Sequence, residues 1–247
     1  WVFWLGRNVF IHIPPGGMSF VKETLSGEGM KVVGKLSIIY MFVAIFWALF
    51  DQTGSTWVIQ ADQLDRHWLG IEWLPSQIQS INPIMILILV PTFSYIIYPF
   101  MGRFFEVTPL RKISMGLFLA VPSFILVGLV QSWLDSGQVT NISWQLIAYA
   151  ILTASEVLVS ITCLEFSYTQ APNHMKSLIM GFFMLSVSLG NIFTAAVNAF
   201  IQNPDGSSKL AGASYFYFFA GLMFVTSLLF LLVLKYYTPK TYLHEEK

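Results

Sequence analysis

The sequence predicts an all-α membrane protein, and three observations support that fold class. Hydrophobic residues make up 55% of the 247 residues and charged residues only 11%, whereas an ordinary soluble domain is roughly a quarter charged. The mean hydropathy is +0.66. Apolar runs of about 20 residues, the length of a helix that crosses a bilayer, recur along the chain. A soluble domain of this size has no core large enough to bury so much apolar surface.

Six such runs are expected to be transmembrane helices, joined by short connections with turn residues. They cover residues 35–60, 77–102, 112–133, 144–168, 176–202 and 212–237. Prolines within them would end a soluble helix, but membrane helices accommodate proline as a kink. These prolines are Pro83, Pro91, Pro99 and Pro122.

The distribution of lysine and arginine predicts the orientation of the helices. Eleven of these residues lie on one side of the predicted spans and two, Arg66 and Lys209, on the other. Under the positive-inside rule the side with eleven is cytoplasmic. We therefore expect an integral membrane protein with both ends in the cytoplasm, in a bacterial inner (cytoplasmic) membrane.

The segments outside the predicted spans contain no motif that indicates a catalytic or metal-binding site. Residues 1–34 are expected to hold the end of a preceding transmembrane helix and a cytoplasmic linker, so we expect a longer chain, and residues 239–247 a cytoplasmic tail. The net charge of zero gives no reason to expect a nucleic-acid partner. Cys163 is alone, so no intramolecular disulfide or CxxC site is possible. Four histidines outside the spans form no ligand-spaced cluster, so we expect no metal or cofactor: His12, His67, His174 and His244.

Acidic residues within the spans are the first candidates for function. Asp51 lies in the first span, Glu156 near the middle of the fourth, and Glu165 near the cytoplasmic end of the fourth. An ionised side chain near the bilayer centre costs on the order of 2.5–3.5 kcal/mol even on insertion scales, and such residues usually mark functional sites. The alternative is that each acid is structural and bonded to a neighbouring helix.

Helical spacing suggests which way these acids point. At 100° per residue, Glu156 and Glu165 lie on opposite sides of the fourth span. Glu156 shares its side with Ser160 and Cys163, so we expect it to face a central cavity and Glu165 to face the cytoplasmic vestibule or a helix-end partner.

The first span offers a second face of the same kind. Trp47 and Asp51 are four residues apart, and Ser55 continues the same face. An aromatic wall beside a carboxylate suits an ammonium group through charge and cation–π attraction. Spans one to three begin inside and spans four to six outside, which is the layout of an inverted repeat. Each acid then falls in the first helix of its triplet, where transporters place their sites.

Three runs of sequence closely resemble the proton-dependent oligopeptide transporter family of the major facilitator superfamily. They are FWALFDQTGSTWVIQA at 46–61, QSINPIMILILVP at 79–91 and EVLVSITCLEFSYTQAPNHMKS at 156–177, with SVSLGN at 186–191 following at the expected distance. The resemblance implies the C-terminal six-helix bundle, residues 35–238, of a major-facilitator fold with at least twelve helices.

The resemblance also assigns roles to individual residues. It implies substrate binding by Trp47, Asn82, Glu156, Phe183 and Ser186, with Glu156 receiving the peptide amino terminus. We expect proton coupling or gating by Asp51, Glu156 and Glu165. Closure of the two bundles would desolvate Asp51, so we expect this residue to alternate between a protonated and a salt-bridged form. Two positions depart from the family pattern, because Phe183 stands where the family often has Trp and Cys163 where it commonly has Gly.

The function we expect is proton-coupled symport of di- and tripeptides by alternating access. The partners are the peptides, protons, the lipid bilayer and the N-terminal bundle, which would carry the family's E-x-x-E-R-F-x-Y-Y motif that this sequence lacks. An intramembrane enzyme would need a Ser–His, HExxH or paired-Asp arrangement, and none is present in the spans. A carrier of nitrate or another non-peptide solute with the same fold remains the alternative, although a buried Glu156 would repel an anion.

Overall fold

The computed structural model describes residues 22, 24–172, 175–205 and 207–237. Within them, six helical segments are long and apolar enough to cross a membrane, which confirms the predicted all-α membrane fold. They are Gly27–Gln63, Pro75–Met101, Pro109–Asp135, Ser143–Gln170, Lys176–Ile201 and Ala213–Tyr236. Most of the predicted linker, the predicted tail, and His12, His174 and His244 lie outside the described residues.

The first segment begins eight residues before its predicted start. Helix α3 (Gly27–Phe50) is capped by Ser26, whose Oγ accepts a hydrogen bond from the backbone N–H of Gly29 at 3.1 Å. The helix tightens into a 3-10 turn at Asp51–Gly54 and resumes as α4 (Thr56–Gln63). A polar cap therefore starts the helix within the segment that the hydropathy pattern assigns to a linker.

The second segment is broken by its prolines. It consists of α5 (Pro75–Ile78), α6 (Ile81–Thr92), a π turn at Phe93–Ile97 and α7 (Tyr98–Met101). The π turn lies between Pro91 and Pro99, each of which lacks the N–H that a regular α-helical ladder needs. Local readjustment of the ladder is the usual response of a membrane helix to proline.

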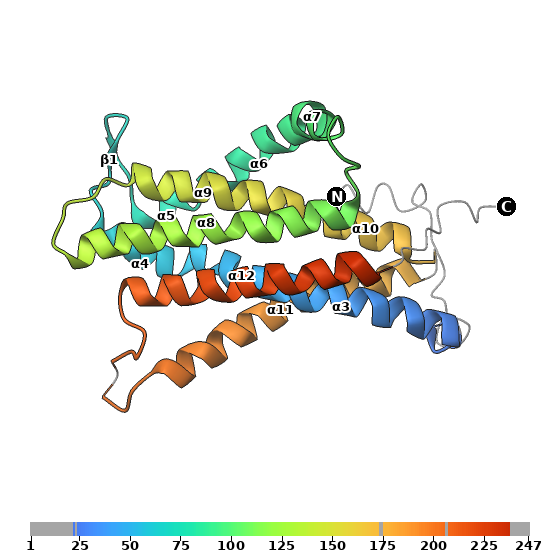
Figure 1. Ribbon diagram of the computed structural model, residues 1–247. Coiled ribbons are helices and arrows are strands. Elements are labelled where there is room, and N and C mark those ends of the chain that lie inside the picture. The colour runs from blue at the N-terminus through green and yellow to red at the C-terminus, as the bar shows by residue number, and fades with distance from the viewer. Residues whose placement is uncertain (1–21, 23, 173–174, 206, 238–247) are drawn as a thin grey trace, which may run out of the picture.

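Of the other four segments, the third, fourth and sixth pack more tightly than the fifth. The third is α8 (Pro109–Asp135); the fourth is α9 (Ser143–Glu156), a π turn at Val157–Ile161 and α10 (Thr162–Gln170); the fifth is α11 (Lys176–Ile201) and the sixth α12 (Ala213–Tyr236). In Figure 1, α8 lies beside both α9 and α12, and α3 beside α11 and α12. Large apolar side chains fill the spaces between them, including Phe46, Trp57, Phe124, Tyr149 and Phe219.

Two helices diverge from this packed group. In Figure 1, α6 leaves it on one side and the C-terminal part of α11 on the other. Only 6% of the most hydrophobic stretch of the second segment and 22% of the fifth are buried, against 61% for the third and fourth. These two helices leave large apolar side chains uncovered, among them Leu87, Ile88, Ile192 and Phe200.

A small hairpin, which the hydropathy pattern does not reveal, lies at the end of the bundle opposite the N-terminus of α3. Strands β1 (His67–Trp68) and β2 (Ile71–Glu72) are antiparallel, with His67 paired to Glu72 and Trp68 to Ile71. Asn141 anchors the hairpin, because its Nδ2 donates to Asp65 Oδ2 and to the carbonyl of His67, both at 3.0 Å. The opposite end holds most of the lysines and arginines and is called the basic end below.

Candidate functional site

Asp51 lies where α3 tightens into its 3-10 turn, and a residue of α11 holds its side chain. Asn191 Nδ2 donates a hydrogen bond to Asp51 Oδ2 at 2.7 Å. One turn further along α11, Thr194 Oγ1 donates to the carbonyl of Ala48 at 3.0 Å. Asp51 is half-buried and Asn191 exposed, so this pair borders the uncovered side of α11. A 3-10 stretch inside a longer helix often marks a functional hinge.

Gly190 brings α3 and α11 close enough for this bond to form. A Cβ added at Gly190 would lie 2.8 Å from the backbone nitrogen of Ala48 and would collide with the carbonyl oxygen of Ala44. The two backbones therefore touch next to Asp51, and only glycine permits that approach. The segment SVSLGN thus supplies both the contact point, Gly190, and the amide, Asn191.

Glu156 has an amide partner of its own, from a different helix. Asn82 Nδ2, at the start of α6, donates to Glu156 Oε2 at 2.8 Å and to Thr153 Oγ1 at 3.1 Å. Thr153 is fully buried, and its hydroxyl donates to the carbonyl of Tyr149 at 2.8 Å. The hydrogen bonds to Asn82 satisfy polar groups that would otherwise be costly at membrane depth.

The two acids are bound in the same way, although they come from different spans. Asp51 follows the last residue of α3 and Glu156 is the last residue of α9, and each accepts a hydrogen bond from an asparagine side chain. Asn82 and Asn191 belong to α6 and α11, which lie in the two least covered spans. The arrangement is a polar intramembrane site of two amide-bound carboxylates.

Glu156 and Glu165 are not related by the regular helical rotation that the sequence argument assumes. The π turn at Val157–Ile161 lies between them and changes the register of the helix, so the predicted 180° separation and the shared face of Glu156, Ser160 and Cys163 do not follow. Cys163 is fully buried in the hydrophobic core. The predicted face through Ser55 is also interrupted, because the chain leaves helical geometry at this residue, with φ −133° and ψ −89°.

Trp47 lies one helical turn before Asp51, as predicted, in a group of aromatic rings. Its ring centroid lies 5.5 Å from that of Phe46 and 5.4 Å from that of Phe50, both edge to face. Its Nε1 is buried and has no hydrogen-bond partner among the described residues. The indole therefore packs as an apolar wall whose donor is unused.

Phe183 and Ser186, both predicted to bind substrate, lie inside the bundle rather than on its uncovered side. Phe183 is 3% exposed and contacts the edge of Tyr40, with a centroid separation of 6.2 Å. Ser186 is fully buried and its hydroxyl donates to the carbonyl of Phe183 at 2.6 Å. In this structure both residues pack in the core, and substrate contact at either one stays a prediction.

Glu165 lies near the basic end, away from the two acid–amide pairs. It is exposed, and its charge acts on Tyr98 of α7. Lys112 Nζ lies 3.9 Å from the centroid of the Tyr98 ring. Glu165 thus belongs to a separate polar group in which Tyr98, Lys112 and Thr162 join α7, α8 and α10.

Sequence reasoning missed Asn191 and Thr153 as members of the site. Asn191 ends the polar run SVSLGN, so its presence in an apolar helix was visible, but its partner on a span 140 positions away was not. Thr153 shows no such signal, because threonine is common in membrane helices and its hydroxyl can bond within its own helix.

The fold and site define a polytopic α-helical membrane protein with a polar intramembrane site. A family model described as the POT family matches residues 18–215. The chain belongs to this family.

Individual relatives and solved structures agree with that assignment. The chain is 31% identical over 204 residues to peptide transporter PTR_A of Candidozyma auris, covering 75% of this chain and 34% of the relative. It is 36% identical over 107 residues to human solute carrier family 15 member 1, covering 43% and 15%. The crystal structure of an auto-inhibited POT family peptide transporter superposes with a TM-score of 0.81 at 32% identity, covering 89% of this chain and 44% of that one.

A second structure gives the same picture. The POT family transporter PepTSo superposes with a TM-score of 0.77 at 34% identity, covering 84% of this chain and 42% of that one. The chain spans about a third of the length of PTR_A and of peptide transporter PTR2 of Saccharomyces cerevisiae.

Proposed function

We propose that this chain is the C-terminal six-helix bundle of a major-facilitator transporter that moves di- and tripeptides together with protons. The observation that carries the proposal is the pair of carboxylates, Asp51 and Glu156, each bound by an asparagine from a loosely covered helix. Membership of the POT family and the names of relatives such as peptide transporter PTR_A of Candidozyma auris and peptide transporter PTR2 of Saccharomyces cerevisiae support the substrate class. The protein is a carrier, not an enzyme.

Glu156 receives the amino terminus of the peptide in this proposal. A carboxylate at membrane depth attracts an ammonium group strongly, because little water is present to screen the charge. Asn82 holds the carboxylate in place and presents α6 to the bound peptide. Trp47 and its aromatic neighbours supply an apolar wall one helical turn before Asp51.

Asp51 exchanges the coupling proton. It sits at a 3-10 turn next to the contact between α3 and α11, so a change in its charge acts where the two helices meet. Protonation of Asp51 removes a charge and weakens its bond to Asn191, because a hydrogen bond to a charged group is the stronger kind. The uncovered faces of α6 and α11 contact the N-terminal bundle, and rocking of the two bundles about the site gives alternating access. Glu165 acts at the basic end as a gating group.

The basic end faces the cytoplasm in this proposal, and so do both ends of the chain. Of the lysines and arginines in described residues, only Arg66 and Lys209 lie toward the hairpin end. This asymmetry is what the positive-inside rule requires of a cytoplasmic side.

The test is transport by the full-length protein in liposomes. Labelled dialanine should accumulate when the outside is acidic relative to the inside, and dissipation of the pH gradient should stop accumulation. Unlabelled dialanine should compete, whereas N-acetyl-dialanine, which cannot carry the ammonium charge, should compete weakly. Accumulation without a proton gradient, or equal competition by the acetylated peptide, would contradict the proposal.

A further inference from the structure

A groove at the basic end is separate from the two acid–amide pairs. It has a volume of about 570 Å³ and lies between the N-terminus of α8 and the C-terminal ends of α10 and α12. Thr169, which lines it, is 13 residues from Glu156 along the fourth span, or about 20 Å at 1.5 Å per residue. None of the described residues that line the groove belongs to α6 or α11, the helices with uncovered faces.

The charges that line the groove are all of one sign. Arg111 comes from the first turn of α8 and Lys235 from the last turn of α12. Arg111 Nη1 donates to the carbonyl of Glu106 at 2.6 Å, which holds the guanidinium beside the start of α8. Among the described residues that line the groove there is no aspartate or glutamate. The groove therefore favours an anion.

The start of α8 adds to this preference. Thr108 caps α8 and lines the groove together with Pro109, Leu110 and Arg111 of the first turn, so the positive end of this 27-residue helix dipole lies beside the groove.

The walls of the groove are apolar and continue onto the surface of the bundle. Leu110 and Phe166 are buried and form its inner side, and Leu231 and Leu234 line it from α12. Leu231 is 42% exposed and its neighbour Leu232 is 55% exposed. Arg and Lys at the end of such an apolar surface occupy the level of lipid head groups when the helices span a bilayer.

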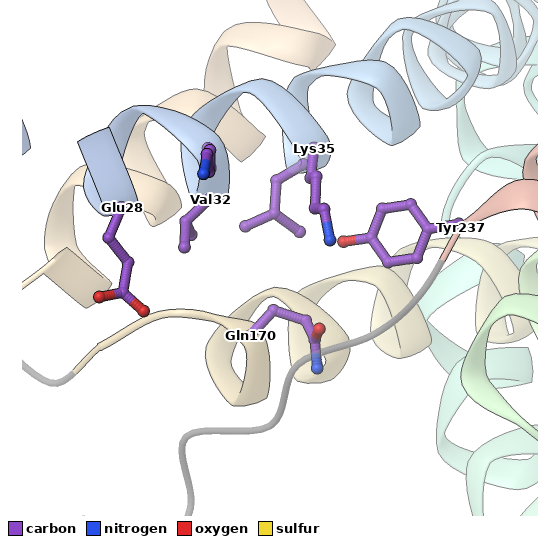
Figure 2. A pocket seen from close by; sticks show the side chains of 7 residues that line it. Glu28, Val32, Lys35, Gln170 and Tyr237 are labelled. Carbon is purple, nitrogen blue, oxygen red and sulfur yellow. The ribbon is translucent and has the colours of Figure 1, made fainter.

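A neighbouring pocket at the same end differs from the groove in the charges that line it. Figure 2 shows this pocket, of about 320 Å³, with Glu28 and Lys35 pointing into it from α3. It shares Gln170 and Tyr237 with the groove. Its lining carries charges of both signs, Glu28 as well as Lys31 and Lys35. The mixed charges of this pocket therefore do not select an anion, whereas the two cations of the groove do.

We propose that the groove between α8, α10 and α12 binds an anionic phospholipid, with its phosphate between Arg111 and Lys235 and an acyl chain along Leu231 and Leu234. Basic pockets between transmembrane helices on the cytoplasmic side are the sites where anionic head groups bind. The continuous apolar wall favours a lipid over a free phosphate, since a soluble anion makes no use of Leu231 and Leu234. A bound lipid would link the ends of three helices.

The experiment measures lipid binding to the full-length protein after mild delipidation in detergent. Dioleoylphosphatidylglycerol and dioleoylphosphatidylcholine are titrated separately and the bound lipid is counted by native mass spectrometry. The double variant Arg111→Gln/Lys235→Gln should bind the anionic lipid roughly thirtyfold more weakly, because each cation near a membrane surface contributes about 1 kcal/mol. Raised ionic strength should weaken binding to the wild type in the same direction.

Control variants separate the groove from the general charge of this end. Arg103→Gln/Lys31→Gln removes two exposed cations that do not line the groove and should leave lipid binding unchanged. The charge-preserving variant Arg111→Lys/Lys235→Arg should retain the lipid, which guards against loss of binding through misfolding.

Three results would overturn the proposal. The first is equal binding of the zwitterionic lipid. The second is equal loss of binding in the control variant. The third is displacement of the lipid by millimolar inorganic phosphate, which would mean that the groove recognises the phosphate alone.

Discussion

The two acid–amide pairs have the same chemistry but sit in different mechanical surroundings. Asp51 and Asn191 join α3 and α11, whose backbones touch at Gly190. Glu156 and Asn82 join α9 to α6, a helix that is hardly buried. The first bond lies at a contact that packing already fixes, whereas the second tethers a helix that has few other contacts in the bundle.

The helix geometry differs in a parallel way. The chain tightens into a 3-10 turn at Asp51 and widens into a π turn directly after Glu156. Both irregularities are of the kind found at functional positions. The comparison suggests a division of labour in which Asp51 senses the proton at a firm crossing and Glu156 senses the substrate beside a movable helix.

The largest expected effect comes from removing each charge in turn. In the full-length protein, Asp51→Asn should abolish pH-driven accumulation of dialanine but leave exchange of labelled for unlabelled peptide, because the amide cannot carry a proton. Glu156→Gln should instead lower the affinity for a free amino terminus by about tenfold or more, the value of a lost charge-assisted hydrogen bond. Uptake and counterflow in the same liposomes measure both. If the two variants behave alike, the division of labour is wrong.

The next effect tests the firmness of the α3–α11 crossing. Gly190→Val places a branched side chain against the backbone of Ala44 and Ala48 and should destabilise the bundle by about 1–3 kcal/mol, as overpacking does. Gly181→Val, in the same helix but with nothing within 4 Å of its added Cβ, is the matched control. Thermal unfolding in detergent should show a lower Tm for the first variant only, and equal Tm values would contradict a tight crossing.

The two amides provide a smaller and more selective test. Asn82→Ala removes a tether of α6 and should increase its mobility, whereas Asn191→Ala should leave α11 in place because Gly190 and Thr194 still hold it. Spin labels are placed at the exposed positions Leu87 of α6 or Ile192 of α11, each paired with a second label at the exposed Leu129 of α8. The distance between the two labels reports the position of α6 or α11 relative to α8. A broadened distance distribution for α11 in the second variant, with none for α6 in the first, would reverse the comparison.

The smallest effect concerns a third acid–asparagine pair, Asp65 and Asn141, which lies outside the spans. Hydrogen bonds from Asn141 and His67 hold the pKa of Asp65 below its usual value of 3.8. A lowered pKa stabilises the folded hairpin above the ordinary pKa, and that contribution is lost as the pH falls through the lower, folded value. Protection of the Asp65 amide, which donates to Thr140, should therefore drop in acid for the wild type and vary less for Asp65→Asn. Hydrogen exchange measures this, and identical acid profiles would argue against the assigned cause.

The sequence predicts the spans well because hydropathy and length decide them. All six are found, and the main error is the start of α3, where the Ser26 cap begins a helix inside the predicted linker. The hairpin at His67–Glu72 escapes prediction, since four paired residues leave no periodic signal.

The sequence predicts which acidic residues belong to the site, but it does not predict how they are oriented or which residues bind them. Asp51 and Glu156 stand out as acids in apolar helices, whereas Asn82 is predicted only through the resemblance to the family. The structure pairs Glu156 with Asn82 and Asp51 with Asn191. The orientation argument for Glu156 and Glu165 fails, because it assumes a uniform helix and one π turn changes the register. The core positions of Phe183 and Ser186 depend on how α11 packs against α3, and a single sequence does not contain that information.

The bond between Asn82 and Glu156 has a thermodynamic consequence for α6. A ligand that competes with Asn82 for the carboxylate weakens the attachment of α6, and by reciprocity any force that pulls α6 away makes the carboxylate more available to that ligand. Binding of a ligand at Glu156 and the position of α6 are therefore thermodynamically coupled, and each shifts the other. A change in the membrane or in the partner bundle that shifts α6 would tune affinity without touching the carboxylate itself.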